Sequence, residues 1–219
     1  AIIVAARTSS KRLPRKVLKT LQGIPMIAFL LRRLTSSKLA NKIILATSNQ
    51  TDDDIVSKIG ISEGVLVYRG ELEDVTARFV RAAMKFNVDT VVRITGDCPL
   101  VNGEVVDYCL SIAYKNDFDL CTTKGFFPIG LDVEIYKSEN MKLLYDSNEL
   151  TAEHREHLTL YYYHNKNKFN FIEIDPPNKW CRSDEVYTVD TLEDYEKVKL
   201  KVEYFNTPIF SISELLALE

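Results

Sequence analysis

Short apolar runs alternate with longer amphipathic segments from the amino terminus of this chain to about residue 117. Runs rich in β-branched residues, each closed by polar residues or glycine, predict strands at residues 2–6, 42–47, 65–68 and 90–94. The segments between them predict helices at 25–35, 53–59, 73–86 and 104–115. Interleaved strands and helices form right-handed βαβ units, so we expect an α/β fold with a mainly parallel central sheet and helices on both faces.

This fold class points to one edge of the sheet as the place for a ligand. In parallel sheets, ligands bind beyond the carboxyl ends of the strands. The loops at that edge begin at four residues: Arg7, Ser48, Arg69 and Thr95.

The pattern changes from about Phe118. Shorter strands are predicted at 118–122, 131–136, 169–174 and 186–189, and helices at 151–166, 191–205 and 211–218. No repeat, linker or low-complexity segment divides the sequence. We therefore expect one domain over residues 1–219, with residues 118–175 as a projecting late segment.

Charge is distributed unevenly along the chain. The 28 Lys and Arg against 31 Asp and Glu give a net charge of −3, which argues against nucleic acid as the main partner. Residues 1–51 carry ten basic residues and no acid, so the remainder carries 18 basic and 31 acidic groups. A positive first quarter on an acidic body predicts a local anion site.

The sequence also bears on location. The four cysteines show no CxxC pair and no metal-ligand spacing, which is typical of reduced thiols. No apolar run reaches the roughly 18 residues that a membrane span needs, and the opening AIIVAA is too short for a signal-peptide core. We expect a cytoplasmic protein without membrane insertion.

Residues 7–16, RTSSKRLPRK, follow the first predicted strand directly and combine five cations with hydroxyl groups and no acid. A triphosphate carries about four negative charges, and backbone N–H groups with Lys and Arg heads bind such groups. The alternative is a solvated basic turn. The loop lacks the GxxxxGK[ST] and GxGxxG patterns of other phosphate-binding loops. We expect an exposed triphosphate-binding loop that includes Lys16.

Two aspartates are candidates for a metal site. Asp97 follows a predicted strand in RITGDCPL, where Pro99 stops the strand. Its carboxylate should therefore stand at the mouth of the cleft that the basic loop also borders. Asp190 opens a predicted helix in VDTLED. If the short strand before Asp190 joins the sheet, the two carboxylates converge and could hold Mg²⁺ against phosphate oxygens. The alternatives are structural: a Gly-Asp turn at Asp97, and helix capping by Asp190 or Thr191.

Weaker candidates lie elsewhere. The acids at 52–54 could mimic a metal-binding DxD motif, but three acids at a helix start usually act as caps and dipole partners. His154 and His157 lie one turn apart on the helix predicted at 151–166, without the HExxH pattern of a zinc site. Cations on that helix could receive a ligand's carboxylate or hydroxyl groups. The aromatic residues within 161–171 are expected in the core or at a subunit interface.

The motifs resemble those of a known family. ARTSSKRLPRKVL, followed by GIPMIAFLLRRL, resembles the amino-terminal signature of the CTP-dependent sugar cytidylyltransferases, which include the CMP-ketodeoxyoctonate and CMP-sialate synthetases. RITGDCPLV and VDTLEDYEKV resemble the family's two aspartate segments. YRGELEDVTARF and GLDVEIY with EHREHLTLY are most similar to the spore-coat polysaccharide SpsF-type branch. The resemblance implies a Rossmann-like nucleotidyltransferase fold of the GT-A type.

Carried over position by position, the resemblance implies a set of site residues. The triphosphate would be held by four residues of the basic loop: Arg7, Ser10, Arg12 and Lys16. Asp97 and Asp190 would bind Mg²⁺ and, with Lys16 and Arg7, form the catalytic set. Arg69 would lie near the cytosine and ribose. The acceptor would lie near four later residues: Glu134, His154, Arg155 and His157.

Two further implications concern the loop and the assembly. Ser9 and Arg15 stand where the family often has glycine, so this loop has less backbone freedom. Members are commonly homodimers joined by the late segment, which here corresponds to residues 118–175 and would also contribute to acceptor binding.

The implied reaction is transfer of CMP from CTP to a sugar acid of the nonulosonic or octulosonic type, with release of pyrophosphate, for surface polysaccharide biosynthesis. No side chain stands out as general base; His154 and a metal-bound hydroxyl are the candidates. One alternative is a sugar-1-phosphate nucleotidyltransferase or a nucleotide-sugar glycosyltransferase of the same fold. Another is a catalytically silent binding subunit.

Overall fold

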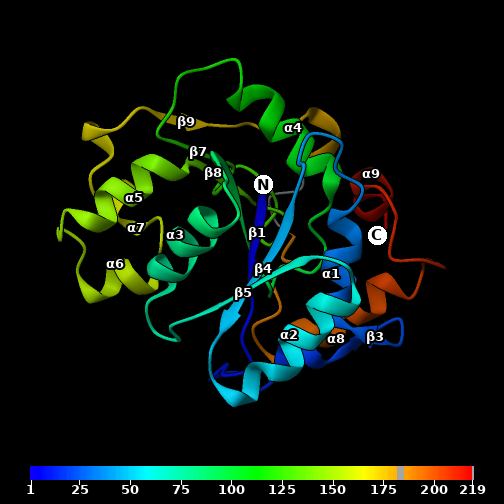
Figure 1. The fold of residues 1–219 in the computed structure, drawn as a ribbon. Helices are drawn as coiled ribbons and strands as arrows, with labels where there is room; N and C mark the ends of the chain where they lie inside the picture. The colour runs from blue at the N-terminus through cyan, green and yellow to red at the C-terminus, as the bar shows by residue number, and fades with distance from the viewer. Residues whose placement is uncertain (182–184, 219) are drawn as a thin grey trace.

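The computed structural model describes residues 1–181 and 185–218. Its main sheet has seven strands in the order β5-β4-β1-β6-β8-β7-β9 (Figure 1). These are β1 (Ile2–Ala5), β4 (Ile43–Ser48), β5 (Leu66–Gly70), β6 (Thr90–Thr95), β7 (Leu120–Thr122), β8 (Glu134–Lys137) and β9 (Phe171–Glu173). β1 pairs in parallel with β4 and β6, whereas β8 runs antiparallel to both β6 and β7. β2 (Thr20–Leu21) and β3 (Ile24–Pro25) form a separate hairpin.

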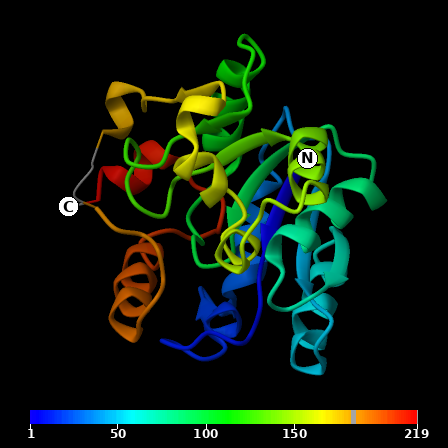
Figure 2. The ribbon, with the colours of Figure 1, turned by 90° about the vertical axis from the view of Figure 1, so that its left-hand side faces the viewer.

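Helices cover both faces of the sheet (Figures 1 and 2). One face carries α1 (Met26–Leu34), α2 (Asp54–Ser62), α4 (Gly103–Ala113), α8 (Leu192–Val202) and α9 (Ile212–Leu216). The other carries α3 (Val75–Lys85), α5 (Ser138–Asp146) and α7 (Leu160–His164), and α6 (Ala152–Glu156) packs on α3. Each face therefore has its own apolar core.

The central strand β1 contributes to both cores. Ile2 and Val4 are fully buried in the core that includes α1 and α4, whereas Ile3 is fully buried in the core that includes α3 and α5. Side chains of a strand alternate between its faces, and a strand covered on both sides is apolar throughout. β1 therefore ends at the middle of the sheet's carboxyl edge, and the chain continues from there into Arg7.

The predicted α/β fold is confirmed. Every strand and helix predicted before residue 118 forms within a few residues of its predicted bounds. The strands predicted at 118–122, 131–136 and 169–174 also form, with shifted bounds, as β7, β8 and β9. Residues 118–175 therefore contribute three strands to the sheet and helices to one of its faces.

The prediction of one helix over residues 151–166 is wrong. The segment forms two short helices, α6 and α7, with three residues between them. Leu158 and Thr159 in this break are buried, and the Thr159 hydroxyl donates a hydrogen bond of 2.9 Å to the Glu134 carboxylate. A tertiary contact thus outweighs helix continuity. Helix α5 is an element that the sequence pattern does not predict.

The aromatic residues within 161–171 pack mainly inside the chain. Tyr162 is fully buried, and its ring centroid lies 4.6 Å from that of Phe169. The ring centroids of Tyr163 and Phe171 are 5.2 Å apart. These contacts serve the core on the α3 face, so the aromatic content of this segment gives no support to a subunit interface.

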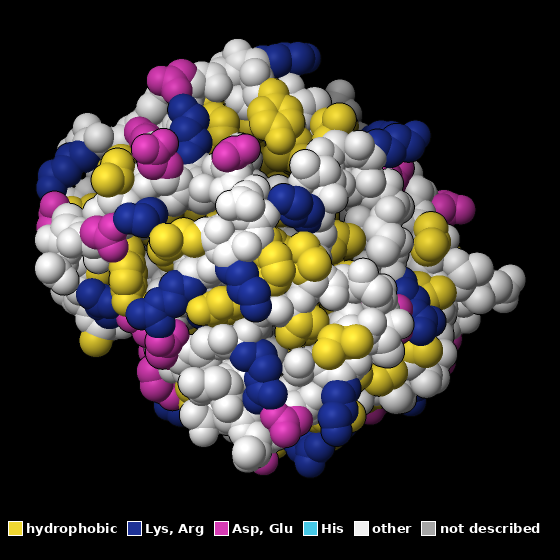
Figure 3. Space-filling view, in the orientation of Figure 1, with side chains coloured by type: hydrophobic (Ala, Val, Ile, Leu, Met, Phe, Trp, Pro, Cys, Tyr) yellow, Lys and Arg dark blue, Asp and Glu magenta, His cyan; other side chains and the backbone are white. Residues whose placement is uncertain are grey.

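No helix in the described part of the chain is both long and apolar enough to cross a membrane. Figure 3 shows basic side chains interspersed with acidic ones over one face of the molecule. That face therefore offers no continuous basic surface.

A buried arginine joins the carboxyl-terminal segment to the core. Arg33, near the end of α1, donates two hydrogen bonds to the Leu100 carbonyl and one of 2.6 Å to the Pro208 carbonyl. Its guanidinium lies 3.8 Å from the ring centroid of Phe210. Burial lowers the pKa of Arg33 to about 9, against the opposing effect of Glu104, so the side chain stays protonated at neutral pH.

We expect Arg33→Met to lower the free energy of unfolding by at least about 2 kcal/mol, because each buried carbonyl that loses its donor costs about 1–3 kcal/mol. Arg32→Met is the matched control, since Arg32 makes an exposed ion pair with Glu63, a kind of contact worth about 0–1 kcal/mol. Urea unfolding followed by circular dichroism measures both variants. Equal losses in the two would contradict the role given to Arg33.

Candidate functional site

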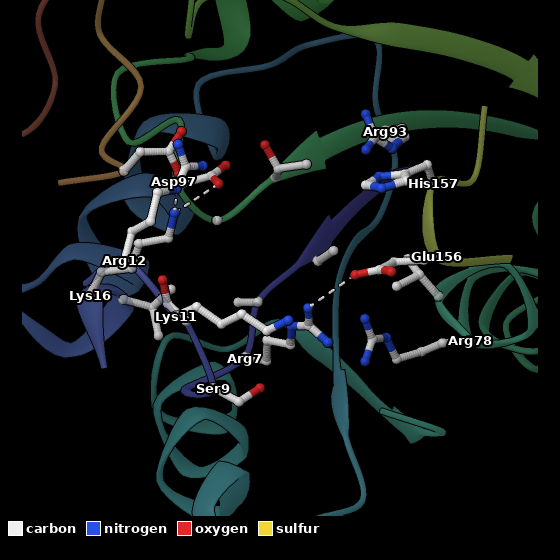
Figure 4. Close-up of a pocket in the computed structure, with 18 residues that line it drawn as sticks. Arg7, Ser9, Lys11, Arg12, Lys16, Arg78, Arg93, Asp97, Glu156 and His157 are labelled. Atoms are coloured by element: carbon white, nitrogen blue, oxygen red, sulfur yellow. Dashed lines mark hydrogen bonds and ion pairs between the residues drawn. The ribbon is translucent and has the colours of Figure 1, made fainter. Parts of the chain in front are cut away.

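A cavity of about 430 Å³ opens beyond the carboxyl ends of β1 and β6, at the edge where the sequence predicts a ligand (Figure 4). Its lining includes the loop after β1, the end of β6, the start of α3 and the link between α6 and α7. Figure 4 shows Lys16 and Asp97 at one end of the cavity and Arg78, Arg93 and His157 toward the other. The two ends differ in chemistry.

Asp53 fixes the start of the basic loop. Its buried carboxylate accepts hydrogen bonds from the backbone N–H and the hydroxyl of Thr8, at 2.7 and 2.8 Å, and from the hydroxyl of Ser48. The N–H groups of Ser10 and Arg15 both donate to the Thr8 carbonyl, at 2.9 and 3.0 Å, which closes the loop on itself. The expected capping role is wrong for Asp53, because its side chain makes no capping hydrogen bond to α2.

Arg15 adopts a backbone conformation that favours glycine. Its φ of 57° and ψ of 26° are left-handed, which costs a residue with a Cβ roughly 1–2 kcal/mol. The family resemblance places glycine at this position, and the structure supplies the physical reason. The turn leads directly into the 3₁₀ helix η1 (Lys16–Leu18), so it sets the point at which Lys16 enters the cavity.

Lys16 is buried at one end of the cavity, not exposed as expected: its residue is 8% accessible. Its Nζ donates to Asp97 Oδ2 at 2.9 Å, to Asp190 Oδ1 at 2.9 Å and to the Val189 carbonyl at 2.8 Å, which uses all three protons. Arg12 adds a second cation 2.8 Å from Asp190 Oδ1. Burial alone would raise the pKa of Asp97, but the charge of Lys16 and the hydrogen bonds that Asp97 accepts from Thr95 and Lys16 together outweigh burial and hold that pKa below its usual value.

Asp97 and Asp190 converge as predicted from the sequence. One oxygen of each lies 2.9 Å from the same nitrogen, so the two oxygens are no farther apart than twice that distance. The way in which the chain brings Asp190 to Asp97 differs from the prediction. The strand predicted at 186–189 is not part of the sheet; instead the Val189 N–H donates to the Asp97 carbonyl at 2.8 Å and ties the two segments together.

Thr191, not Asp190, is the cap of helix α8. Its hydroxyl accepts a hydrogen bond from the Asp194 N–H at 3.2 Å, and the Asp194 carboxylate accepts one from the Thr191 N–H at 2.8 Å. This reciprocal pair is a capping box. The carboxylate of Asp190 contacts Lys16 and Arg12 instead, so helix capping does not account for it.

The other end of the cavity holds cations with few partners. Arg78 of α3 is 2% exposed, and the structure shows one hydrogen bond from it, from Nη1 to the Glu71 carbonyl at 3.2 Å. Its Nε is buried without a partner, and it forms no ion pair with another described residue. Arg93 pairs with Glu134 at 2.5 Å through Nη1, and its Nε is also buried without a partner. Neither arginine is among the residues predicted from the sequence.

Of the four residues assigned to the acceptor, His157 lines the cavity and Glu134 does not. Glu134 is buried, and its oxygens accept from Arg93, from the Thr159 hydroxyl and from the Tyr163 hydroxyl. Its expected contact with the acceptor therefore has no support from the lining of the cavity and stays a prediction. Glu134 orients Arg93 and holds the link between α6 and α7.

His154 and Arg155 also lie outside the lining of the cavity. The His154 Nδ1 accepts a hydrogen bond from the Thr151 N–H in the capping box of α6, and its Nε2 lies 3.2 Å from the His164 Nδ1. Arg155 pairs with Asp74 at 2.9 Å. Both side chains are engaged in contacts outside the cavity, so the acceptor role expected of them and the role of His154 as a base have no support from its lining and stay predictions.

Of the five residues expected to bind the nucleotide, four line the cavity and one does not. The four loop residues expected to hold the triphosphate all line the cavity: Arg7, Ser10, Arg12 and Lys16. Arg69 does not line it; this side chain pairs with Asp54 at 2.6 Å and donates to the carbonyls of Ser48 and Gln50 at 3.0 and 2.8 Å. Arg69 therefore braces the loop after β4, and its contact with a nucleotide base stays a prediction.

Comparison with known proteins identifies the family of the chain. The family model described as Cytidylyltransferase matches residues 1–217. The spore coat polysaccharide biosynthesis protein SpsF of Bacillus subtilis is 31% identical over 99% of this chain and 92% of its own length. An uncharacterized protein of Methanocaldococcus jannaschii is 37% identical over 89% of this chain and 79% of its own length.

Solved structures show the same fold. A cytidylyltransferase from Leptospira borgpetersenii serovar Hardjo-bovis superposes with a TM-score of 0.91, at 33% identity, over 98% of this chain and 91% of its own. The structure of CMP:2-keto-3-deoxy-manno-octonic acid synthetase complexed with CTP superposes with a TM-score of 0.70 over 93% of this chain and 98% of its own, at 18% identity, which shows the fold alone. The resemblance drawn from the motifs is confirmed, and this chain belongs to the cytidylyltransferase family of nucleotidyltransferases.

Proposed function

We propose that this cytidylyltransferase transfers CMP from CTP to a sugar acid, with release of pyrophosphate, in the synthesis of a surface polysaccharide. One observation supports the choice of acceptor: Arg78 is a buried cation that forms no ion pair at contact distance with another described residue, at the end of the cavity away from Asp97 and Asp190. A carboxylate on the acceptor would supply that counter-ion. The name of the Bacillus subtilis relative supports the link to polysaccharide synthesis.

The end of the cavity at the basic loop fits a triphosphate. The loop supplies cationic heads from Lys11, Arg12 and Lys16, together with the Ser10 hydroxyl. Arg7 also lines the cavity, and its guanidinium extends toward Glu156, at 3.7 Å. Charged hydrogen bonds of this kind are about twice as strong as neutral ones, and a fixed loop positions them in advance. Triphosphate binding is the role we assign to this loop.

Asp97 and Asp190 fit a bound Mg²⁺. Magnesium takes oxygen ligands, commonly one or two carboxylates together with phosphate oxygens and water. The place between these carboxylates already stabilises a cation, since the Lys16 ammonium lies there. When held by Asp97 and Asp190, Mg²⁺ would supply positive charge that neutralises the charge developing on the leaving pyrophosphate.

The electrostatics of Arg78 favour an anionic acceptor. Burial, and next the charge of Arg7, lower the pKa of Arg78 to about 10 against the opposing charges of three carboxylates, so the side chain remains a cation at neutral pH; the three belong to Asp53, Glu71 and Asp74. A buried charge that lacks a partner is costly, and an anion that enters the cavity relieves that cost. Arginine binds carboxylates through pairs of N–H groups, and the Nη1 of Arg78 is the one already engaged.

The remaining residues of the cavity fit the transfer step. A hydroxyl of the acceptor would attack the α-phosphorus of CTP in line, while Lys16 and Arg12 balance charge on the departing phosphates. His157 lines the cavity next to Arg93, so it replaces His154 as the candidate proton acceptor for that hydroxyl. Most of the rate enhancement would come from positioning and charge neutralisation.

A sugar 1-phosphate is the competing acceptor, since its phosphate could also pair with Arg78. A nucleotide-sugar glycosyltransferase reaction and a catalytically silent subunit also compete with the proposed transfer. The assembled cluster of Lys16, Asp97 and Asp190 speaks against a silent subunit. The homodimer, the cytoplasmic location and the absence of a nucleic-acid partner stay predictions; sedimentation at micromolar concentration tests the first.

We expect pyrophosphate release from CTP when eight- or nine-carbon 2-keto sugar acids are supplied, and none with sugar 1-phosphates.

Arg78→Met should raise the KM for the sugar acid roughly tenfold or more, because a hydrogen bond to a charged group contributes about 1.5–3 kcal/mol. The KM for CTP should stay near the wild-type value. A coupled pyrophosphate assay measures all three quantities.

Arg81→Met is the matched control, since Arg81 lies on the same helix but is exposed and pairs with Glu71. A rise in the KM for CTP in Arg78→Met would place Arg78 at the triphosphate instead. Turnover with sugar 1-phosphates alone would replace the sugar acid as the acceptor.

Asp97→Asn and Asp190→Asn should each abolish most turnover, and the double variant should lose little more than either single one, because ligands of one ion act as a unit. Asp194→Asn is the control: it removes a charge from the capping box four residues away and should affect stability more than turnover. Steady-state kinetics at saturating CTP measures the set. Near-normal turnover in Asp190→Asn would rule out the metal role of Asp190.

A further inference from the structure

The Lys16 ammonium occupies the place where the two carboxylates of the metal site meet. It lies 2.9 Å from Asp97 Oδ2 and 2.9 Å from Asp190 Oδ1, and its third proton is donated to the Val189 carbonyl. Arg12 lies 2.8 Å from the same oxygen of Asp190. Two carboxylates and two cations thus form a compact cluster whose charges balance without any ligand.

The position between the carboxylates of Asp97 and Asp190 can hold one cation at a time. A Mg²⁺ ion bound to both carboxylates would stand about 2.1 Å from their oxygens. The Lys16 ammonium is within hydrogen-bond distance of those same oxygens, so the two like charges would be almost in contact. Repulsion at such a distance is strong in a partly buried site, where water screens it poorly.

The lysine has a second position within reach. Its side chain is a flexible four-carbon stem that carries a compact charge, so the ammonium can move without a change in the backbone. Lys16 lines the cavity beside the loop that we assign to the triphosphate. Phosphate oxygens can therefore replace both aspartates as partners of Lys16 once a nucleotide is present.

From these contacts we infer that Lys16 is the resident counter-ion of the metal site and exchanges places with the metal. In the nucleotide-free protein it neutralises Asp97 and Asp190 and weakens the binding of free divalent cations. When metal and CTP enter together, the metal takes the carboxylates and Lys16 moves to the phosphates. Metal and nucleotide consequently bind as a unit, and each raises the affinity for the other. The inference rests on the proposed function, because a metal-bound triphosphate is the displacing ligand.

Binding of Mn²⁺, followed through the relaxation rate of water protons, tests this exchange without an acceptor. Mn²⁺ with CTP but without protein provides the baseline. Wild type should bind Mn²⁺ weakly alone and tightly with CTP. Lys16→Met should bind Mn²⁺ without CTP at least about tenfold more tightly than wild type, a coupling of ordinary size for two ligands of one site. CTP should then enhance Mn²⁺ binding less in this variant than in wild type.

The matched control is Lys19→Met, which removes a nearby charge that contacts the Tyr195 ring and does not line the cavity. It should behave as wild type. Lys16→Gln, which keeps a polar side chain, serves if Lys16→Met fails to fold, and adding Asp97→Asn to either should abolish the binding gained. Circular dichroism checks the fold of each variant.

The outcomes separate this inference from the proposed function. Equal Mn²⁺ affinity of wild type and the Lys16 variants without CTP would overturn the exchange, as would a lack of Mn²⁺ binding by the folded variants. If wild type fails to bind Mn²⁺ even with CTP, the metal–nucleotide site itself is wrong, whatever Lys16 does.

Discussion

The ion cluster of Lys16, Asp97 and Asp190 joins three parts of the chain that are far apart in sequence: the loop after β1, the end of β6 and the start of α8. Two carboxylates this close together repel each other, and burial adds to the cost. The Lys16 ammonium removes that repulsion, and Arg12 adds a second cation. The end of the cavity to which we assign catalysis is therefore assembled in the free protein by the same charges that we expect the nucleotide and metal to use.

The rest of the fold serves to hold this cluster in place. Strand β1 is buried on both faces, so its carboxyl end is a rigid point from which the basic loop departs. Asp53, from the loop after β4, then binds both the N–H and the hydroxyl of Thr8. The hydrogen bond from Val189 to Asp97 fixes the third segment without a strand in the sheet. A loop held at its start and end can present charges at fixed positions, which is the requirement for catalysis by positioning.

The sequence predicts the part of this arrangement that depends on local patterns. The alternation of strands and helices places the loops after β1 and β6 at one edge, and four of the five cations of the basic loop line the cavity there. The break near Leu158 could not be predicted in this way, because it depends on the contact of Thr159 with Glu134, a partner distant in sequence. Asp53 had a sufficient local explanation as a helix cap, which hid its role as the anchor of the loop.

The burial of Arg78 could have been predicted from the pattern of its helix. Helical spacing places it on the same side of α3 as Val75 and Ala82, so the amphipathic pattern puts a charge on the apolar face. A cation at such a position is buried, and a buried cation needs a partner. Glu134 and His154 are the opposite case: their residue types fit a binding site, but tertiary contacts engage them elsewhere.

The central claim is that the cluster of Lys16, Asp97 and Asp190 is the metal–triphosphate site. A crystal structure with CTP and Mg²⁺ bound tests this claim most directly. The account predicts an ion about 2.1 Å from oxygens of both aspartates and of the triphosphate, with the Lys16 ammonium on phosphate oxygens. A bound CTP that leaves Lys16 Nζ 2.9 Å from both Asp97 and Asp190, with no ion between them, would contradict it.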